Sequence, residues 1–230
     1  MDYEKRTEYL CTLLSDAPQG ALVLDLACGT GTFSYALMER GFDVIGIDAS
    51  LDMLAQALDK AAQANIAPPL LLCQKLEELD LYGTAQAAVC LTDSLNHITD
   101  PAAVRRFFRR LALFVEPGGL FVFDVNTLYK HEYVMGDNTF VRECDGAFCV
   151  WQNHWIPEER TTEIVLDVFE AEGALYRRAG ERFAERAYSV EELTAWLGRA
   201  GFVVERIWGE LVLEAPREDE ERIYFVARKK

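Results

Sequence analysis

Short apolar runs alternate with longer amphipathic segments over the first half of the chain. Between Ala21 and Val125 the apolar runs are ALVLDLA, DVIGID, LLLC, AAVCL and LFVFDV, and segments of helical periodicity separate them. Short apolar runs bounded by turn residues are typical of buried strands, and strands that alternate with helices form a parallel sheet. This pattern predicts an α/β fold of Rossmann-like type, with a mostly parallel sheet and helices on both faces.

Residues 126–188 depart from this pattern. The segment is rich in Thr, Val, Phe, Tyr and Trp. Turn residues interrupt it at three places, which are Asp145-Gly146, Pro157 and Gly173. Extended stretches joined by such turns predict three or four antiparallel strands. After them a capping box at Ser189 to Glu192 starts a helix that ends at Gly201, and two strands, FVVERIW and RIYFVARK, follow. We therefore predict a single domain over residues 1–230 that carries one antiparallel β insertion.

Composition and charge narrow the class of protein. A chain of 230 residues that is 50% hydrophobic has enough material for its own core. The charged start MDYEKRTEYLCTLL is unlike a secretory signal, and no run of about 18 apolar residues predicts a membrane span. The net charge of −15 repels a phosphate backbone. We therefore expect a cytoplasmic protein that binds neither membrane nor nucleic acid.

The six cysteines form no C-x-x-C pair and mostly lie in apolar runs. Free thiols in a reducing compartment are the favoured interpretation, and a bridge between Cys144 and Cys149 is the alternative. No metal-ligand spacing is present among these residues, so we expect no metal site.

A glycine-rich loop, ACGTGTF, follows the first predicted strand. Gly29 and Gly31 allow a tight turn and close approach of a ligand to the backbone. Asp25 lies four residues before Gly29, where its carboxylate would repel a pyrophosphate but attract a cationic amine. The third glycine of the dinucleotide pattern is replaced by Ser34. The loop thus favours a ligand with an amine, and an ordinary strand-to-helix turn is the alternative.

The second predicted strand ends in Asp48, at the distance from the loop where an acid accepts both hydroxyls of an adenosine ribose. Both dinucleotides and S-adenosylmethionine carry this ribose, so Asp48 is informative only together with Asp25. A charge near the N-terminus of the next helix is the alternative role, with Ser50 as the helix cap.

In combination these residues resemble the class I S-adenosylmethionine-dependent methyltransferases, over nearly the whole chain. LDLACGTG resembles the first motif of that family and VIGIDAS the second. The resemblance implies a seven-stranded sheet, S-adenosylmethionine as cofactor and S-adenosylhomocysteine as product. It assigns to the cofactor Asp25, Ala27, Cys28, Gly29, Gly31, Asp48, Ala49, Met53, Lys75, Leu76, Leu91, Thr92 and Asp93.

Within this resemblance, Asp25 belongs to the network around the methionine amine, Asp48 holds the ribose, and Met53 packs on the adenine. The stretch AVCLTDSLNH resembles the fourth strand and the loop beneath the transferred methyl group. Lys75 is a departure, because the family commonly offers an acid to the adenine amine at this place. Small-molecule members carry an antiparallel insertion after the fifth strand, so we expect residues 126–188 to cover the acceptor as a lid.

His97 is the candidate general base, since it follows the fourth strand at the carboxyl end of the sheet, where ligands bind in such folds. The alternative is that His97 only shapes the loop before Asp100, and no acid is spaced to fix its tautomer. His131 and His154 are weaker candidates. Trp151, Asn153 and Trp155 share one face of a predicted strand, as sheet core or as a substrate platform.

The sequence therefore predicts a methyltransferase that acts on an unidentified small molecule, of unknown oligomeric state. A non-catalytic S-adenosylmethionine-binding regulator is the first alternative. A nicotinamide-dependent oxidoreductase is the second, and both Asp25 and Ser34 argue against it.

Overall fold

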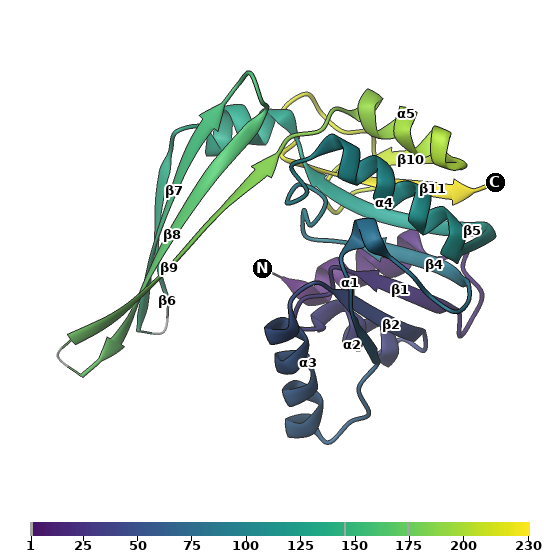
Figure 1. Ribbon diagram of the computed structural model, residues 1–230, viewed down its shortest axis with the longest axis horizontal. Coiled ribbons are helices and arrows are strands. Elements are labelled where there is room, and N and C mark those ends of the chain that lie inside the picture. Colours follow the sequence, from purple (N-terminus) through teal and green to yellow (C-terminus); the bar gives the residue numbers. More distant parts are fainter. Residues whose placement is uncertain (1, 145, 174) are drawn as a thin grey trace.

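The chain forms a central sheet covered by helices and a second, smaller sheet that extends from it (Figure 1). The computed structural model describes residues 2–144, 146–173 and 175–230. The central sheet has seven strands in the order β10-β11-β5-β4-β1-β2-β3. Its strands are β1 (Leu22–Leu26), β2 (Asp43–Asp48), β3 (Leu70–Cys73), β4 (Ala85–Cys90), β5 (Val115–Asn126), β10 (Phe202–Trp208) and β11 (Arg222–Lys229).

Strand β11 runs antiparallel to both of its neighbours, β5 and β10, whereas the pairs among β1 to β5 are parallel. The mostly parallel, Rossmann-like sheet predicted from the sequence is thereby confirmed. Parallel strands bring their carboxyl ends to one edge of the sheet. The predicted ligand-binding residues after β1, β2 and β4 consequently meet at that edge.

Helices cover both faces of the central sheet. On one face, α1 and α2 pack through Leu10, Phe33 and Leu37. On the other face, α4 and α5 pack through Phe107 and Trp196. The helices are α1 (Tyr3–Leu13), α2 (Thr32–Glu39), α3 (Leu51–Ala64), α4 (Pro101–Phe114) and α5 (Val190–Ala200), with the short turns η1 (Leu76–Glu78) and η2 (Lys130–Met135). None of the described helices is long and apolar enough to cross a membrane.

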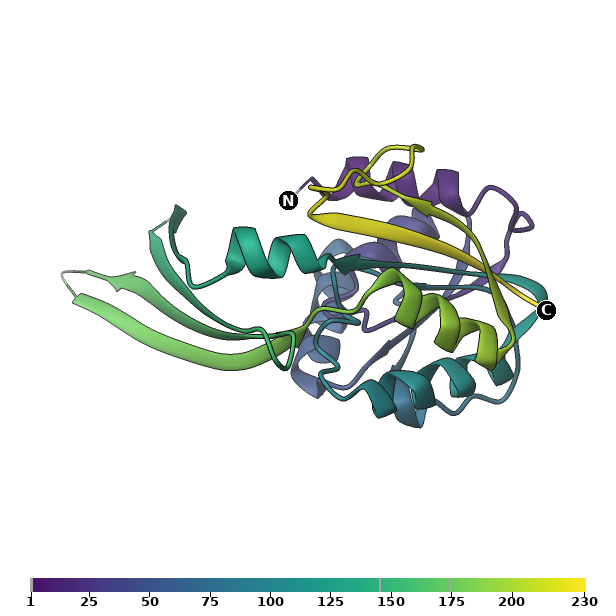
Figure 2. The same cartoon turned by 90° about the horizontal axis from the view of Figure 1, so that it is seen from above.

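The segment between η2 and α5 forms a four-stranded antiparallel sheet in the order β6-β7-β8-β9. Its strands are β6 (Thr139–Cys144), β7 (Ala147–Ile156), β8 (Thr161–Glu172) and β9 (Leu175–Arg186). Figure 2 shows this sheet projecting from the rest of the molecule as an arm. The predicted antiparallel insertion is therefore confirmed, and its strands are long enough to reach well beyond the central sheet.

The predicted turns fall between the strands of the arm. Gly146 and Gly173 have φ angles of 80° and 64°, a region that favours glycine, while Asp145 lies outside the described residues. Pro157 opens the turn between β7 and β8. Cys149, one of the two residues considered for a bridge, is a free thiol.

The start of α5 is closed by the capping box that the sequence predicts. The N–H of Glu192 donates to Ser189 Oγ at 3.2 Å, and the N–H of Ser189 donates to Glu192 Oε2 at 3.0 Å. These bonds satisfy two backbone donors, one of them at the start of the helix, that would otherwise lack partners. Because α5 follows β9 directly, this cap also fixes where the arm returns to the central domain.

We expect Ser189→Ala to lower the free energy of unfolding by about 1 kcal/mol, because it removes the acceptor for the Glu192 N–H. Urea denaturation followed by circular dichroism measures the change. Ser189→Asp is the matched control, since aspartate also caps helices and should keep most of the stability. Equal stability of Ser189→Ala and the native protein would contradict the role of this cap.

Candidate functional site

The glycine-rich loop follows β1 at the carboxyl edge of the sheet and adopts a backbone that suits glycine. Gly29 and Gly31 have φ angles of 55° and 73°. A Cβ on Gly31 would lie 3.2 Å from the Tyr35 ring and 3.3 Å from the Ala57 side chain, whereas a Cβ on Gly29 would meet nothing within 4 Å. Gly31 therefore serves helix packing, and Gly29 presents bare backbone to open space.

Asp48, at the end of β2, holds this loop in place. The N–H of Gly29 donates to Asp48 Oδ2 at 2.8 Å, and the N–H of Ser50 donates to Asp48 Oδ1 at 2.8 Å. Each carboxylate oxygen retains a lone pair for a further donor. Asp48 can thus fasten the loop and still accept ribose hydroxyls.

Asp25 lies beneath the loop and is almost inaccessible, with an exposed fraction of 2%. The Ser34 hydroxyl donates to its Oδ2 at 2.5 Å. Burial raises the pKa of Asp25 to about 7, and the neighbouring charge of Asp48 adds to this effect. The Ser34 that replaces the third glycine is therefore a partner of Asp25, which explains why an acid and a serine occur together here.

A cavity of about 500 Å³ opens beside Asp48, and six of the predicted site residues line it. They are Ala27, Asp48, Ala49, Lys75, Leu76 and His97. The predicted Met53 lies on the first turn of α3 and is 44% exposed, and it is not among the lining residues. The structure therefore brings the residues after β1, β2, β3 and β4 to one cavity, as a nucleoside ligand requires.

The loop after β4 is held by a buried carboxylate that the sequence analysis did not single out. The N–H groups of Thr92 and Asp93 donate to the two oxygens of Asp124 at 2.7 Å and 2.9 Å. Both loop residues have positive φ angles, 56° and 55°. Such conformations are costly for residues other than glycine and persist where surrounding bonds enforce them. Asp124 supplies those bonds.

Arg222, the first residue of β11, neutralises this site. Its guanidinium bonds to Asp93 Oδ1 at 2.6 Å and also pairs with Asp124. The Arg222 and Asp124 side chains are 6% and 1% exposed. The two carboxylates share one buried arginine, so each of them has a cationic partner.

His97 lies beside a carboxylate from the arm. Its Nε2 is 3.7 Å from Oε1 of Glu185 on β9, and its ring lies 5.2 Å from the ring of Phe183. Glu185 is buried, with an exposed fraction of 4%. Burial, together with the charge of Asp93, raises its pKa to about 7. The arm thus contributes an acid to the site, and this acid lies near the imidazole for which no acid was found by local spacing.

The other candidate side chains are placed differently. His131 is fully buried, its Nδ1 is 2.8 Å from the Thr162 hydroxyl, and burial lowers its pKa to about 4. His154 is exposed and bonds to Asp137 at 2.9 Å. Trp151 donates its Nε1–H to Asn153 Oδ1 at 2.7 Å. We therefore keep His97 as the accessible histidine beside the cavity.

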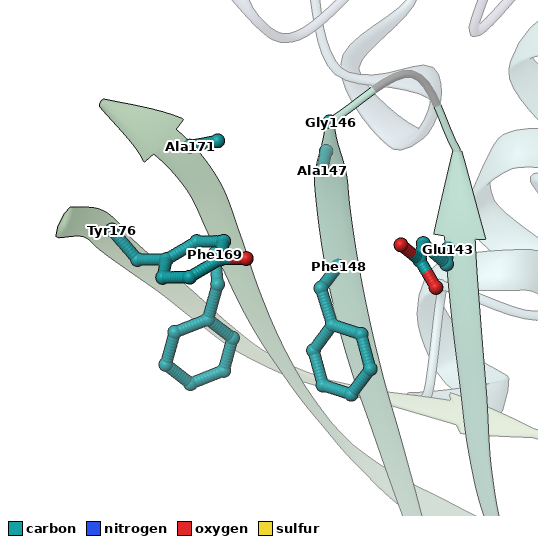
Figure 3. Close-up of a pocket in the computed structure, with 7 residues that line it drawn as sticks. All are labelled: Glu143, Gly146, Ala147, Phe148, Phe169, Ala171 and Tyr176. Carbon is teal, nitrogen blue, oxygen red and sulfur yellow. The ribbon is translucent and has the colours of Figure 1, made fainter. Parts of the chain in front are cut away.

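A second cavity, of about 400 Å³, lies near the tip of the arm. Phe148, Phe169 and Tyr176 line it with their rings on one side of the sheet (Figure 3). The strand register places Phe148 and Phe169 on the face opposite to Trp155 and Glu185. This cavity is consequently separate from the site at the base of the arm.

Three residues of the site were not predicted from the sequence. They are Asp124, Glu185 and Arg222. Asp124 could have been recognised from the sequence, because it is an acid near the carboxyl end of an apolar run, like Asp25 and Asp48. Glu185 and Arg222 lie in charged stretches whose local sequence is typical of solvent-exposed faces. Only the pairing of distant strands reveals their burial.

Comparison with known proteins agrees with this geometry. A family model described as a methyltransferase domain matches residues 23–119. YqeM of Bacillus subtilis (strain 168), a methyltransferase by name, is 32% identical over 228 residues, which cover 99% of this chain and 90% of that protein.

Solved structures extend the likeness to the whole fold. The crystal structure of an S-adenosylmethionine-dependent methyltransferase from Clostridium acetobutylicum ATCC 824 matches with a TM-score of 0.92 at 26% identity, covering 100% of this chain and 92% of that one. CalS10 of Micromonospora echinaspora, an amino pentose methyltransferase with S-adenosylmethionine bound, matches with a TM-score of 0.76 at 21% identity, covering 100% and 90%.

We expect Asp48→Ala to weaken binding of S-adenosylhomocysteine by about 2 kcal/mol or more, because it removes both a charged acceptor and the anchor of Gly29. Isothermal calorimetry measures the affinity. Asp43→Ala is the matched control, since Asp43 begins the same strand and is exposed. Asp25→Ala should also lose affinity while keeping the native circular dichroism spectrum. Unchanged affinity of Asp48→Ala would overturn the ribose assignment.

Proposed function

The chain belongs to the class I S-adenosylmethionine-dependent methyltransferases, and from this premise we propose that it methylates a small molecule bound between the cofactor cavity and the base of the arm. One observation carries the proposal: Glu185 and Phe183 of β9 meet His97, which itself lines the cavity. An acceptor in contact with these residues would lie beside the cofactor. Membership of this family also excludes the nicotinamide-dependent alternative.

The arm is the proposed lid over the acceptor, within a single domain of residues 1–230. Its face toward the site carries Trp155, Leu166 and Phe183, which the strand register places on the same side as Glu185. This face combines apolar side chains with the polar residues Asn153, Thr162 and Glu185, and such a mixture suits a small organic ligand. CalS10, which shares the fold, is described as an amino pentose methyltransferase, and this supports a small-molecule acceptor.

The proposed cofactor residues have distinct tasks. Asp48 accepts the ribose hydroxyls, Gly29 offers bare backbone, and the loop of Thr92 and Asp93 forms the floor below the reacting groups. When bound, the cofactor supplies a methyl group already activated by a sulfonium. The protein then has to align the nucleophile, exclude water and accept a proton. Lys75 lines the cavity where relatives offer an acid, so its backbone is the proposed adenine contact.

His97 is proposed either as the general base or as a residue that shapes the acceptor pocket. Its side chain is 47% exposed, so it can reach a ligand, and Glu185 lies 3.7 Å from its Nε2. That distance is longer than a hydrogen bond, although catalytic contacts often tighten once a ligand binds. Both roles remain compatible with this geometry and differ in their pH dependence.

A cytoplasmic location is proposed on the thiols and the charge. Cys11, Cys28, Cys73, Cys90 and Cys149 are free, as in a reducing compartment. The net charge of −15 disfavours nucleic acid as an acceptor.

Replacing residues 127–188 by a short Gly-Ser linker should abolish methyl transfer and spare much of the S-adenosylhomocysteine binding, because the cofactor residues lie outside this segment. A screen of small molecules for methyl transfer identifies an acceptor first, and calorimetry then follows cofactor binding. If the shortened, folded protein methylated that acceptor at the native rate, the arm would not be the lid.

With an acceptor known, the pH profile of kcat for His97→Gln distinguishes its two roles. A general base predicts a loss on the order of 100-fold or more that shrinks at high pH, where the acceptor ionises unaided. A shaping role predicts a loss of roughly tenfold or less with no recovery at high pH. Because the buried Glu185 carboxylate faces the same pocket and can itself take a proton, we expect the second outcome. A loss of 100-fold or more that recovers at high pH would contradict it.

A further inference from the structure

Asp93, His97 and Glu185 come from two separate parts of the fold and converge beside the cofactor cavity. One ligand atom from each lies within 4.8 Å of the other two. Asp93 and His97 belong to the loop after β4, whereas Glu185 is on the arm strand β9. Since the first two residues flank the proposed methyl position and the third closes the lid, this cluster is where an acceptor atom would react.

The spacing of these three ligand atoms fits one nitrogen atom between them. The three ligand atoms lie within 4.8 Å of one another. For an equilateral triangle with sides of this length, the centre lies about 2.8 Å from each corner, and a smaller triangle brings the centre closer. One nitrogen atom can therefore lie within about 2.8 Å of all three ligand atoms. This is the length of a hydrogen bond between an ammonium and a carboxylate. A primary ammonium has three N–H donors, one for each of the three acceptors.

The charges near Glu185 leave one negative charge unmatched. Asp93, Asp124 and Glu185 are three carboxylates, and Arg222 and Lys130 are two cations, so the difference is one. Glu210, which lies 3.7 Å from Arg222, pairs with Arg6 and leaves this difference unchanged. Neither imidazole near the Glu185 carboxylate is within hydrogen-bond distance of it. The Nε2 atoms of His97 and His131 lie 3.7 Å and 3.9 Å from its oxygens. Burial lowers the pKa of His131 to about 4, so it is neutral at pH 7. A monocation would restore the balance.

Glu185 is also poorly satisfied for a buried carboxylate. Its only hydrogen bond among the described residues comes from the Asn126 amide at 3.4 Å. Arg222 bonds instead to Asp93 and Asp124, and Lys130 Nζ donates to Asn126 Oδ1 at 3.0 Å. Buried charges are normally paired or tightly bonded. The Oε1 atom that faces His97 is therefore ready for a cationic ligand.

We propose that Asp93, His97 and Glu185 bind the ammonium group of the acceptor, which makes the substrate a primary amine and Glu185 the group that takes its proton. The proposal rests on the proposed function. Phe183 stacks beside His97 and supplies an apolar side to the same pocket. An amine attached to an apolar or ring-shaped body fits this surface.

The transfer balances without any further reactant. The ammonium gives one proton to the Glu185 carboxylate, and the amine turns about its C–N bond so that its freed lone pair faces the methyl carbon. The new N–C bond forms as the C–S bond breaks, and the electron pair of that bond goes to sulfur. The products are a methylammonium, a neutral thioether and a protonated Glu185, which then releases its proton to solvent.

A divalent metal ion fits the cluster less well. Zinc and magnesium lie about 2.0–2.2 Å from their nitrogen and oxygen ligands. Each Asp93 oxygen already accepts one bond, Oδ1 from Arg222 at 2.6 Å and Oδ2 from the Asn126 amide at 3.0 Å, and keeps a second lone pair that can accept an N–H without displacing either partner. A metal would also add two positive charges where one is needed.

The test is a binding experiment on the full chain saturated with S-adenosylhomocysteine. Calorimetry at pH 8 compares benzylammonium with benzyl alcohol, which has the same ring but no charge. Native protein should bind benzylammonium at least tenfold more tightly, and Glu185→Gln should lose this preference. Glu181→Gln is the matched control, because Glu181 lies on the same face of β9 and is exposed, and it should keep the preference.

The pH dependence gives a second readout. Glu185 must be ionised to hold the ammonium, and burial raises its pKa to about 7. The affinity of native protein for benzylammonium should therefore rise as pH increases through about 7 and fall again when the amine loses its proton. Glu185→Gln should lack the rise near pH 7.

Equal affinities for the amine and the alcohol, or a preference that survives in Glu185→Gln, would overturn the proposal. Binding of Zn²⁺ or Mg²⁺ that depends on Glu185, without binding of benzylammonium, would overturn it as well. Titration with S-adenosylhomocysteine separates a failure of the ammonium proposal from a failure of the proposed function. Native protein and Glu185→Gln should bind S-adenosylhomocysteine with equal affinity. If the native protein did not bind S-adenosylhomocysteine, the proposed function itself would be contradicted.

Discussion

The buried pairing of Arg222 with Asp93 and Asp124 is the interaction on which the site depends. It joins the start of β11, the end of β5 and the loop after β4 at one edge of the sheet. Asp124 also accepts the N–H groups of Thr92 and Asp93, which holds that loop in its left-handed conformation. A buried ion pair that loses one partner typically costs about 3–5 kcal/mol. The loop that forms the floor below the cofactor and the acceptor is therefore fixed by charge.

Two further connections extend from this anchor. On the cofactor side, Asp48 ties the glycine-rich loop to the end of β2. On the acceptor side, Asn96 donates through its Nδ2 to the carbonyl of Arg186 at 2.9 Å, and its own carbonyl accepts from the Arg186 N–H at 2.8 Å. These bonds fasten the end of β9 to the loop that carries His97. Glu185 is thus held beside His97 although the rest of the arm extends into solvent, and a preorganised site of this kind needs little rearrangement to bind its acceptor.

Much of this arrangement was predictable because it follows from local rules. The apolar runs gave the strands of the central sheet, Ser50, Asp100 and Ser189 capped the helices as expected, and the loop at Gly29 with Asp48 marked the cofactor side. The acceptor side was not predictable in the same way. Glu185 lies 88 residues from His97 in the sequence and is buried only because β9 returns to the central sheet at this point. Contacts of this kind depend on strand pairing and not on spacing along the chain.

The central claim is that one edge of the sheet holds the cofactor and the acceptor side by side above the loop of Thr92 and Asp93. An experimental structure of the complex with S-adenosylhomocysteine tests it most directly. The account predicts that both ribose hydroxyls bond to Asp48 and that the sulfur points toward the space between Asp93, His97 and Glu185. A complex in which the ribose lies away from Asp48, or in which the sulfur points away from those three residues, would contradict it.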